Sequence, residues 1–264
     1  MFKLTLPDGS IKEYEEKKSV KELIADISEG LERASVGAVF NDVILGKHDV
    51  IDEDGTFKVV KFEDPEGKQI FWHSSAHLMA HAIKRLYPDT KFAIGPSIEN
   101  GFYYDIDLDK QLSPDDLEHI EKEMKAIVKE SPVFEKEVVS KEKVKSIFKD
   151  EPYKIELIED LPADEEISIY RLGDFVDLCR GPHLENIKNI KAIKLTSIAG
   201  AYWRGDENNK MLQRIYGISF TKKKELDEYL ERMEEAKRRD HRKIGKELDL
   251  FSFREEGPGF PFFH

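Results

Sequence analysis

Two short segments, about 100 residues apart, constrain this chain more than any other feature of its sequence. The first places His73 and His77 four residues apart, and in a helix this spacing puts both imidazoles on one face. The second places Cys179, the only cysteine, four residues before His183. A fold that joins these groups would form either a tetrahedral metal site or a metal-free cluster for proton transfer and water activation.

The spacing alone leaves several kinds of site open. Three histidines and one cysteine suit tetrahedral zinc, although His-x-x-x-His pairs also occur by chance in helices. A helical metalloprotease motif needs a glutamate after the first histidine, and Ser74 stands there instead, so a protease is not expected. Unrelated core or surface histidines are a further alternative. Cys179 as a covalent nucleophile is disfavoured, because no neighbouring residue guarantees a thiolate.

Polar and aromatic residues near these segments extend the candidate site. Asp177 lies two residues before Cys179, so in a strand both side chains would point to one face. The turn at Gly181-Pro182 lets the backbone approach a ligand closely. Residues 101–105 combine a flexible glycine, two phenols and a carboxylate, which belong either to a core or to a pocket wall. Lys154 is expected to open a strand and, taken alone, is typical of a surface lysine.

Composition narrows the class of protein. The 264 residues can hold two compact units, and 39% hydrophobic residues suffice for ordinary cores. No apolar run approaches the length of a transmembrane helix, and the N-terminus lacks the apolar region of a signal peptide. A single cysteine excludes an internal disulfide and favours a reducing, cytoplasmic location. The net charge of -12 argues against broad non-specific binding to nucleic acid, but a local basic face remains compatible with it.

Residues 1–62 are predicted to form a small α+β unit. Asp8-Gly9 is a strong hairpin signal between two alternating segments. Ser19 is expected to cap a helix over residues 20–29, and Gly30 to end it. Hairpin, helix and further strands in this order are typical of a ubiquitin-like β-grasp fold, an accessory module without chemistry. The expected strands cover residues 1–6, 11–14, 37–40 and 56–62.

Residues 63–220 are predicted to form a larger α+β domain. Residues 65–67 are interpreted as a linker, and a helix over residues 70–86 carries the first histidine pair and ends before Pro88. Further helices are expected over 114–130 and 141–149, and strands over 92–94, 101–106, 133–139, 155–158, 168–172, 175–178 and 192–198.

Residues 221–246 are predicted to form one long charged helix. Its basic stretch, residues 237–243, is either a solvated face or a contact for RNA phosphates. Residues 247–264 include several apolar residues and a stretch rich in glycine and proline at 257–261, and they are interpreted as the entry to a further domain.

Seven motifs occur along the chain: HSSAHL (73–78), AIGP (93–96), NGFYYD (100–105), DLCRGPH (177–183), GAYWRGD (200–206), NKMLQRIYG (209–217) and RDHRKIG (239–245). Together they resemble the N-terminal part of bacterial threonyl-tRNA synthetases, in the order found in that family. The histidine and cysteine pairs alone would also fit editing domains related to alanyl-tRNA synthetases, whereas the later motifs single out the threonyl enzymes.

The resemblance implies a domain layout. Residues 1–62 are similar to the TGS domain, residues 63–220 to the editing domain and residues 221–246 to the linker helix. Residues 247–264 are similar to the start of the class II aminoacylation domain. The parent enzyme would use ATP, Mg²⁺ and one Zn²⁺ through residues beyond 264, so no cofactor and no activation of threonine are expected in this chain. The parent is expected to be a homodimer, and this chain alone a monomer.

The resemblance also implies an activity, the hydrolysis of tRNA(Thr) mischarged with serine. Serine keeps the hydroxyl of threonine and lacks one methyl group, which is worth roughly 1–3 kcal/mol of discrimination, so a second site must remove the errors. The expected partner is the acceptor end of tRNA(Thr), and no membrane is involved. A non-catalytic tRNA-binding module and a zinc-dependent aminoacyl-tRNA deacylase are the alternatives.

Site roles follow from this resemblance and from the chemistry of the side chains. No metal is expected, because the family's site is taken to work without one although its ligands are like those of the alanyl zinc site. The expected catalytic residues are His73, His77, Lys154, Cys179 and His183, and the expected substrate-binding residues are Gly95, Gly101, Tyr104, Asp105 and Asp177.

Overall fold

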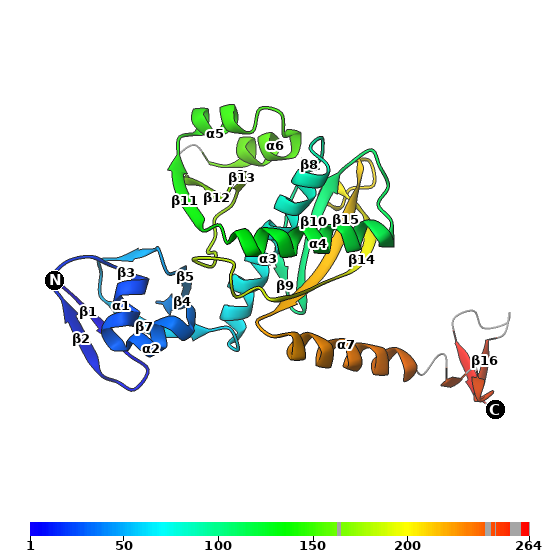
Figure 1. Cartoon of the computed structure of the whole chain (residues 1–264), viewed down its shortest axis with the longest axis horizontal. Helices are drawn as coiled ribbons and strands as arrows, with labels where there is room; N and C mark the ends of the chain where they lie inside the picture. Colours follow the sequence, from blue (N-terminus) through cyan, green and yellow to red (C-terminus); the bar gives the residue numbers. More distant parts are fainter. Residues whose placement is uncertain (163–164, 241–243, 246, 254–259, 264) are drawn as a thin grey trace. The chain divides into compact units, whose positions relative to one another are not determined.

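The computed structural model describes residues 1–162, 165–240, 244–245, 247–253 and 260–263 (Figure 1). The chain divides into two compact units, Met1–Ser219 and Phe220–His264. Helices and strands are mixed in the first unit, so the predicted α+β class is confirmed. The boundaries of the four predicted segments stay a prediction. Within the described part of the chain, no helix has both the length and the apolar character needed to span a membrane.

A five-stranded sheet with one helix on its face forms the N-terminal part of the first unit. The strand order is β2-β1-β7-β4-β5, in which β1 and β7 are parallel and the other neighbours are antiparallel. Helix α1 buries Val20, Leu23 and Ile24 against the sheet, which confirms the β-grasp prediction. The elements are β1 Phe2–Thr5, β2 Ile11–Tyr14, β3 Lys18–Ser19, α1 Val20–Ile27, α2 Glu29–Ala34, β4 Ser35–Phe40, β5 Val43–Gly46, β6 Val50–Ile51 and β7 Gly55–Lys61.

The end of α1 differs from the prediction. Ser19 caps α1 in a capping box with Glu22, as expected. Gly30, however, does not end the helix, since α1 stops at Ile27 and Gly30 lies inside α2. The cause is Ser28, whose backbone is extended and whose side chain accepts a hydrogen bond from the Leu31 N–H. A second N-cap at Ser28 therefore starts a new helix directly after the first.

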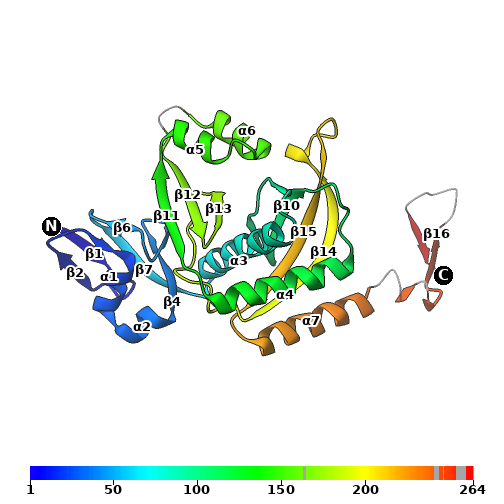
Figure 2. The same cartoon turned by 45° about the horizontal axis from the view of Figure 1, so that its top comes forward.

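The larger part of the first unit is built around helix α3. A sheet of order β14-β15-β10-β8, with β9 paired to β10, has α3 against β10 and α4 against β14. The two helices also contact each other, so they cover one face of this sheet (Figure 2). The elements are α3 Pro65–Leu86, β8 Lys91–Phe92, β9 Ser97–Ile98, β10 Gly101–Asp107, α4 Pro114–Glu130, β14 Ala192–Tyr202 and β15 Met211–Phe220.

The predicted linker at residues 65–67 is wrong, because α3 begins at Pro65. Proline suits the first position of a helix, where its missing N–H would have no partner. Gly67 is buried inside the helix, and a Cβ there would lie 1.8 Å from the Lys61 carbonyl oxygen. The chain therefore passes from β7 into α3 with almost no connection, and the glycine permits the close approach of the two elements.

A second, three-stranded sheet carries part of the candidate site. Its strand order is β11-β12-β13, and α5 and α6 follow β11. Residues 155–158, predicted as a strand, belong to helix α6, so Lys154 lies on a helix as well. Pro152 occupies the first turn, and Lys154 and Ile158, four residues apart, are both buried on one side. The elements are β11 Phe134–Val139, α5 Lys141–Ile147, α6 Pro152–Asp160, β12 Ile167–Leu172 and β13 Phe175–Leu178.

The second unit contains helix α7, Lys223–Arg238, and a two-stranded ribbon of β16, Phe251–Phe253, and β17, Pro261–Phe263. Leu226 is the buried residue of α7, and the Tyr229 ring packs on Phe220 with centroids 5.8 Å apart. The helix predicted to run to residue 246 ends at Arg238. The basic residues 241–243 and residue 246 lie outside the described part of the chain.

Candidate functional site

Helix α3 and the segment after β13 bring the two distant motifs together. The Cys179 Sγ lies 3.3 Å from the His73 Nε2 and 3.3 Å from the His183 Nε2. The His73 and His77 ring centroids are 5.1 Å apart, and each lies 4.3 Å from the His183 centroid. One donor atom from each of the four residues lies within 4.8 Å of the others. The four predicted side chains therefore form one cluster.

Ser74 connects the helix to the loop that carries His183. Its hydroxyl donates to the Ile70 carbonyl at 2.8 Å and accepts from the Leu184 N–H at 2.9 Å. It also lies 3.2 Å from the His183 Nδ1. Because the single hydroxyl proton is used on Ile70, Nδ1 must be the donor, which leaves the His183 Nε2 as an acceptor facing the Cys179 thiol.

Gly181 permits the turn of this loop. It has a φ of +76°, and a Cβ there would lie 2.2 Å from the Tyr170 hydroxyl oxygen. Its N–H donates to the Cys179 Sγ at 3.1 Å. The loop is thus held from both sides, by Tyr170 and by the thiol.

A second group of side chains joins the cluster at Asp177. The Asp177 Oδ2 accepts a hydrogen bond from the Tyr104 hydroxyl and lies 3.6 Å from the His77 Nδ1. The Lys154 ammonium lies 2.5 Å from the Asp177 Oδ1 and donates to the Tyr104 hydroxyl at 3.1 Å. Lys154 and Asp177 are only 3% and 2% exposed, so their charges face each other in a nearly dry environment. Lys154 is therefore not a surface lysine.

Three aromatic rings that the sequence analysis did not select enclose the cluster. The Phe134 ring stacks on His183 with centroids 4.4 Å apart and an angle of 8°, and Tyr170 meets the same imidazole edge-on at 4.6 Å. Phe175 meets His77 edge-on at 6.5 Å. These residues come from three strands, and nothing in their local sequence links them to the histidines.

Desolvation keeps the imidazoles uncharged. It lowers the pKa of His73 to about 4 and the pKa of His77 to about 3, although the Asp177 carboxylate opposes the shift. It also takes the pKa of His183 well below its usual value, and the other two histidines add to the shift. At neutral pH all three rings are therefore neutral and can accept hydrogen bonds.

The thiol and the phenol keep their protons, whereas the carboxyl group does not. Desolvation raises the pKa of Cys179 to about 12, and it raises the pKa of Tyr104 well above its usual value. For Asp177, desolvation alone would raise the pKa, but Lys154, His77 and the Tyr104 hydroxyl together hold it below its usual value. The site therefore combines neutral imidazoles, a neutral thiol and one carboxylate paired with an ammonium.

The Lys154–Asp177 pair leaves one acceptor position open. The buried Asp177 Oδ1 lies 2.5 Å from the Lys154 ammonium, and no other described residue donates a hydrogen bond to this oxygen. Burying such an oxygen without a full set of donors is costly. It is consequently suited to accept a bond from a further cationic donor.

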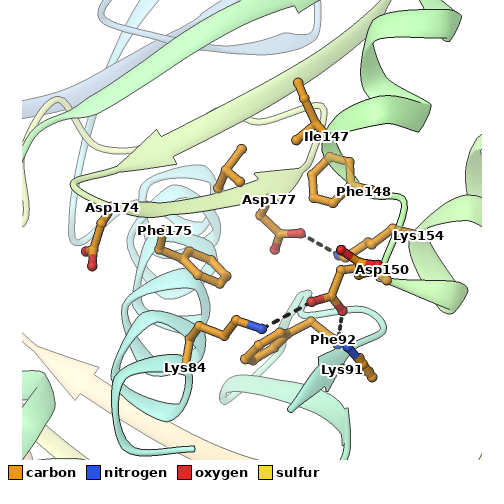
Figure 3. Close-up of a pocket in the computed structure, with 12 residues that line it drawn as sticks. Lys84, Lys91, Phe92, Ile147, Phe148, Asp150, Lys154, Asp174, Phe175 and Asp177 are labelled. Atoms are coloured by element: carbon orange, nitrogen blue, oxygen red, sulfur yellow. Dashed lines mark hydrogen bonds and ion pairs between the residues drawn. The ribbon is translucent and has the colours of Figure 1, made fainter. Parts of the chain in front are cut away.

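A pocket of about 450 Å³ reaches this carboxylate and the Lys154 ammonium (Figure 3). The Lys84 ammonium lies in its wall, 3.3 Å from the Glu151 Oε1. The four histidine and cysteine donors do not line it. Its described walls include Lys84, Lys91, Phe92, Phe148, Asp150 and Phe175.

Gly95 and Gly101 support the site through packing. A Cβ on Gly95 would lie 2.1 Å from the Tyr104 ring, so this glycine makes room for the phenol. Gly101 has a φ of +124° and opens β10, where a Cβ would lie 2.3 Å from the Gly217 carbonyl oxygen on β15. The close pairing of β10 and β15 thus explains why residue 101 is a glycine, and no ligand is needed to explain it.

Asp105 is not brought into the cluster. It follows Tyr104 on β10, and successive side chains of a strand point to opposite faces. Its two carboxylate oxygens bind the Arg214 Nε at 2.7 Å and Nη2 at 2.8 Å. The Arg214 guanidinium lies 3.9 Å from the centre of the Tyr103 ring. The predicted substrate contact of Asp105 therefore receives no support from the geometry.

The donor set has the residue types of a tetrahedral zinc site, and its four donor atoms lie within 4.8 Å of one another, so they would have to draw closer to bind the ion. The edges of such a site, with bonds of about 2.0–2.3 Å, measure about 3.3–3.8 Å. The two sulfur–nitrogen distances of 3.3 Å fall at the lower end of this range. The thiol would then have to lose its proton, and three histidines with one cysteine would hold the ion.

Comparison with known proteins shows two domain matches and several close relatives. The TGS domain model matches residues 2–61, and the model described as the threonyl and alanyl tRNA synthetase second additional domain matches residues 167–216. The threonine–tRNA ligase of Finegoldia magna is 63% identical over 266 residues, and that of Clostridioides difficile is 60% identical over 265 residues. Each alignment covers 100% of this chain.

This chain matches the N-terminal region of threonine–tRNA ligases over its whole length. It spans 42% of the length of each of these two relatives. The relative from Caldanaerobacter subterraneus is 57% identical over 263 residues and is covered to 41%. In threonine–tRNA ligase terms, the chain comprises an N-terminal region with a TGS domain and an editing-type domain. Asp177, Cys179 and His183 all fall inside the second match.

Proposed function

We propose that this chain hydrolyses the ester that joins serine to the terminal adenosine of mischarged tRNA(Thr). A water oxygen bonds to the ester carbonyl carbon, and the bond from that carbon to the ribose oxygen breaks. One water proton ends on the ribose oxygen, so that free serine and intact tRNA leave. Discrimination against threonine needs only a pocket too small for its extra methyl group.

The open acceptor on Asp177 is the observation that supports this proposal most directly. A seryl ester carries an α-ammonium group, and the buried Asp177 Oδ1, which is paired with the Lys154 ammonium at 2.5 Å, keeps a second lone pair without a donor among the described residues. The amino group would bind there, beside Lys154, and His77, whose Nδ1 lies 3.6 Å from the Asp177 Oδ2, would link this carboxylate to the other histidines.

The neutral groups of the cluster suit the activation of water. His73 and His77 would accept hydrogen bonds from the attacking water, and Asp177 would stabilise the positive charge that develops on His77 as a proton moves. Lys154 and His183 would stabilise the oxyanion or the leaving oxygen. With a pKa near 12, Cys179 would orient water rather than attack the ester. Tyr104, positioned by Gly95, would limit the size of the serine pocket.

The role of the complete protein follows from the family. We propose that it attaches threonine to tRNA(Thr) with ATP, in the cytoplasm, and that this chain supplies the correction step. The acceptor end of tRNA would be the direct partner of this chain.

A zinc-dependent deacylase is the second candidate, favoured by the 3.3 Å spacing of the sulfur and nitrogen atoms. A zinc ion held by three of these four side chains, with water as its fourth ligand, would supply an activated water at neutral pH. Lys154, Asp177 and Tyr104 would keep the same tasks in substrate binding.

One experiment tests both candidates. The chain is incubated with seryl-tRNA(Thr) and threonyl-tRNA(Thr), and the loss of each ester is followed with and without a chelator. Rapid loss of serine alone, unaffected by the chelator, supports the metal-free hydrolase, whereas loss that stops with the chelator supports the zinc enzyme. The variant His73→Ala is expected to lose at least tenfold in rate, and His119→Ala, an exposed histidine on α4, is the control. Tight tRNA binding with no turnover would contradict both proposals.

A further inference from the structure

The hairpin between β14 and β15 carries the GAYWRGD motif, although this motif lies outside the cluster. Its tip is a short 3₁₀ turn, Trp203–Gly205, in which Arg204 has a φ of +57°. A non-glycine residue with positive φ is uncommon and costs conformational energy. The surrounding structure must therefore stabilise this turn.

Helix α6 is the element that the hairpin tip contacts. The Arg204 Nε lies 2.8 Å from the Glu156 Oε1, and its Nη2 lies 2.5 Å from the Asp160 Oδ2. The Trp203 Nε1 donates to the other carboxylate oxygen of Glu156 at 2.9 Å. One carboxylate of α6 thus binds two consecutive residues of the hairpin, and the guanidinium bridges two turns of the helix.

Apolar packing reinforces these polar contacts. The Tyr153 ring meets the Trp203 indole edge-on, with centroids 5.1 Å apart, and Leu157 packs against the same small cluster. Tyr153 lies three and four residues before Glu156 and Leu157, and Asp160 lies four and three residues after them, so the four share one face of α6.

Helix α6 depends on such support. It has only nine residues, and isolated helices of this length are unstable in water. Lys154 lies between the hairpin contacts of Tyr153 and Glu156 and points inward to Asp177 and Tyr104. A shift of the helix would move this ammonium directly.

We propose that Trp203 and Arg204 are positioning residues that hold α6 and thereby aim Lys154 at the Asp177 carboxylate. The expected effect on the reaction rate rests on the proposed hydrolysis. The claim that the hairpin holds α6 in place does not. The hairpin motif would then serve the reaction without touching the substrate.

The kinetic test is a double-mutant cycle on seryl-tRNA(Thr) hydrolysis under single-turnover conditions. Arg204→Gln is expected to lower the rate constant about tenfold, because a shift of the Lys154 ammonium by about 1 Å can reduce a rate by that factor or more. The tRNA concentration at half saturation is expected to change less than twofold. In a Lys154→Met background the same Arg204→Gln change is expected to lower the rate less than twofold. Equal losses in both backgrounds would show that Arg204 does not act through Lys154.

Arg171→Gln is the matched control. Arg171 is 40% exposed, Arg204 is 39% exposed, and each pairs with a glutamate, but Arg171 pairs with Glu137 rather than with α6. Its loss is expected to leave the rate within twofold of the parent chain. Arg204→Gly is a second variant that removes the side chain while keeping the positive φ, and it should match Arg204→Gln.

Amide hydrogen exchange tests the structural half independently of activity. In Arg204→Gln the amides of α6 are expected to exchange at least tenfold faster, while those of α3 keep their rates. Unchanged exchange in α6 would overturn the proposal even if the activity fell. A parent chain without hydrolysis would count against the proposed function, and the exchange experiment would still decide whether the hairpin holds α6.

Discussion

The Ser74 hydroxyl accepts a hydrogen bond from the His183 Nδ1 at 3.2 Å, which joins the two halves of the cluster across 109 residues. The same oxygen accepts from the Leu184 N–H. Ser74→Ala would leave both donors without this partner inside the protein, at a cost of about 1–3 kcal/mol in the free energy of unfolding. His183 would also lose its fixed tautomer, so seryl-tRNA(Thr) hydrolysis is expected to fall about tenfold.

Ser75 offers a matched control for this prediction. It is the next residue of α3, is equally buried, and its hydroxyl bonds to the Phe71 carbonyl at 2.9 Å and to the Ser219 hydroxyl at 2.7 Å. Ser75→Ala is expected to lower stability by a comparable amount but to leave hydrolysis within about twofold. Equal losses of activity in both variants would mean that Ser74 acts only through stability. Urea unfolding and single-turnover hydrolysis supply the two measurements.

The lowered pKa values of the histidines predict a pH-dependent stability. His73, with a pKa of about 4, is neutral when folded down to that pH, whereas the unfolded chain takes up a proton near pH 6.5. Below pH 6.5 the unfolded state thus binds more protons, so stability is complete above that pH and falls as the pH drops toward 4. Each such histidine contributes a slope of about 1 kcal/mol per pH unit in this window.

The slope can be measured by urea unfolding at pH values from 7.5 to 5. His73→Gln is expected to reduce it by about 1 kcal/mol per pH unit. His119→Gln, which changes an exposed histidine on α4, is expected to leave the slope as it is in the parent chain. If His73→Gln left the slope intact, the imidazole would not be held neutral by burial.

Local sequence patterns predicted most helices and strands because their causes are local. Ser19 and Pro114 begin helices where capping chemistry places them, and Asp8-Gly9 lies in the turn of the first hairpin. Lys154 was misassigned, because a short helix fixed by distant contacts with Trp203 leaves only a weak local signal.

Some features of the candidate site were likewise predictable from the sequence, and others were not. The i, i+4 spacing of His73 and His77 brought both rings to one face, and the match of motifs to a family placed Asp177 beside them. The stacking of Phe134 on His183 could not be predicted, because it depends on how two sheets and a loop pack, not on residue spacing. Asp105 was included from its place in a motif, yet strand alternation turns it toward Arg214.

Burial of the thiol predicts slow alkylation. With a pKa raised to about 12, Cys179 holds about 1,000-fold less thiolate at pH 7.5 than a cysteine at the ordinary value of 9.0. Iodoacetamide is therefore expected to react with the native chain at least about 100-fold more slowly than with the urea-unfolded chain. The metal content is measured on the same sample, because a zinc ion bound to the sulfur would also slow alkylation. Rapid alkylation of a metal-free native chain would show that the thiol is activated.

The β-grasp part contacts the loop of the candidate site at Gly46. Added here, a Cβ would lie 3.1 Å from the Pro182 Cβ and 3.3 Å from the His183 carbonyl oxygen, both tighter than ordinary contacts. The Gly46 N–H is held by the Asp49 Oδ2 at 2.8 Å, and the other oxygen of Asp49 binds Lys136 on β11 at 3.0 Å. Because these bonds hold the turn at Gly46 in place, the loop with Pro182 and His183 would have to move instead.

Gly46→Ala is accordingly expected to displace the loop that carries His183 and to lower seryl-tRNA(Thr) hydrolysis about three- to tenfold. Gly30→Ala is the control in the same β-grasp part, because Gly30 is exposed and a Cβ there would meet only the Ser28 hydroxyl at 3.6 Å. Hydrolysis by Gly30→Ala should match that of the parent chain. Since Gly46 lies outside the segment that bears the histidines and the cysteine, a selective loss in Gly46→Ala would mean that the β-grasp part helps to shape the site. Full activity in Gly46→Ala would instead show that the loop keeps its catalytic geometry without this contact.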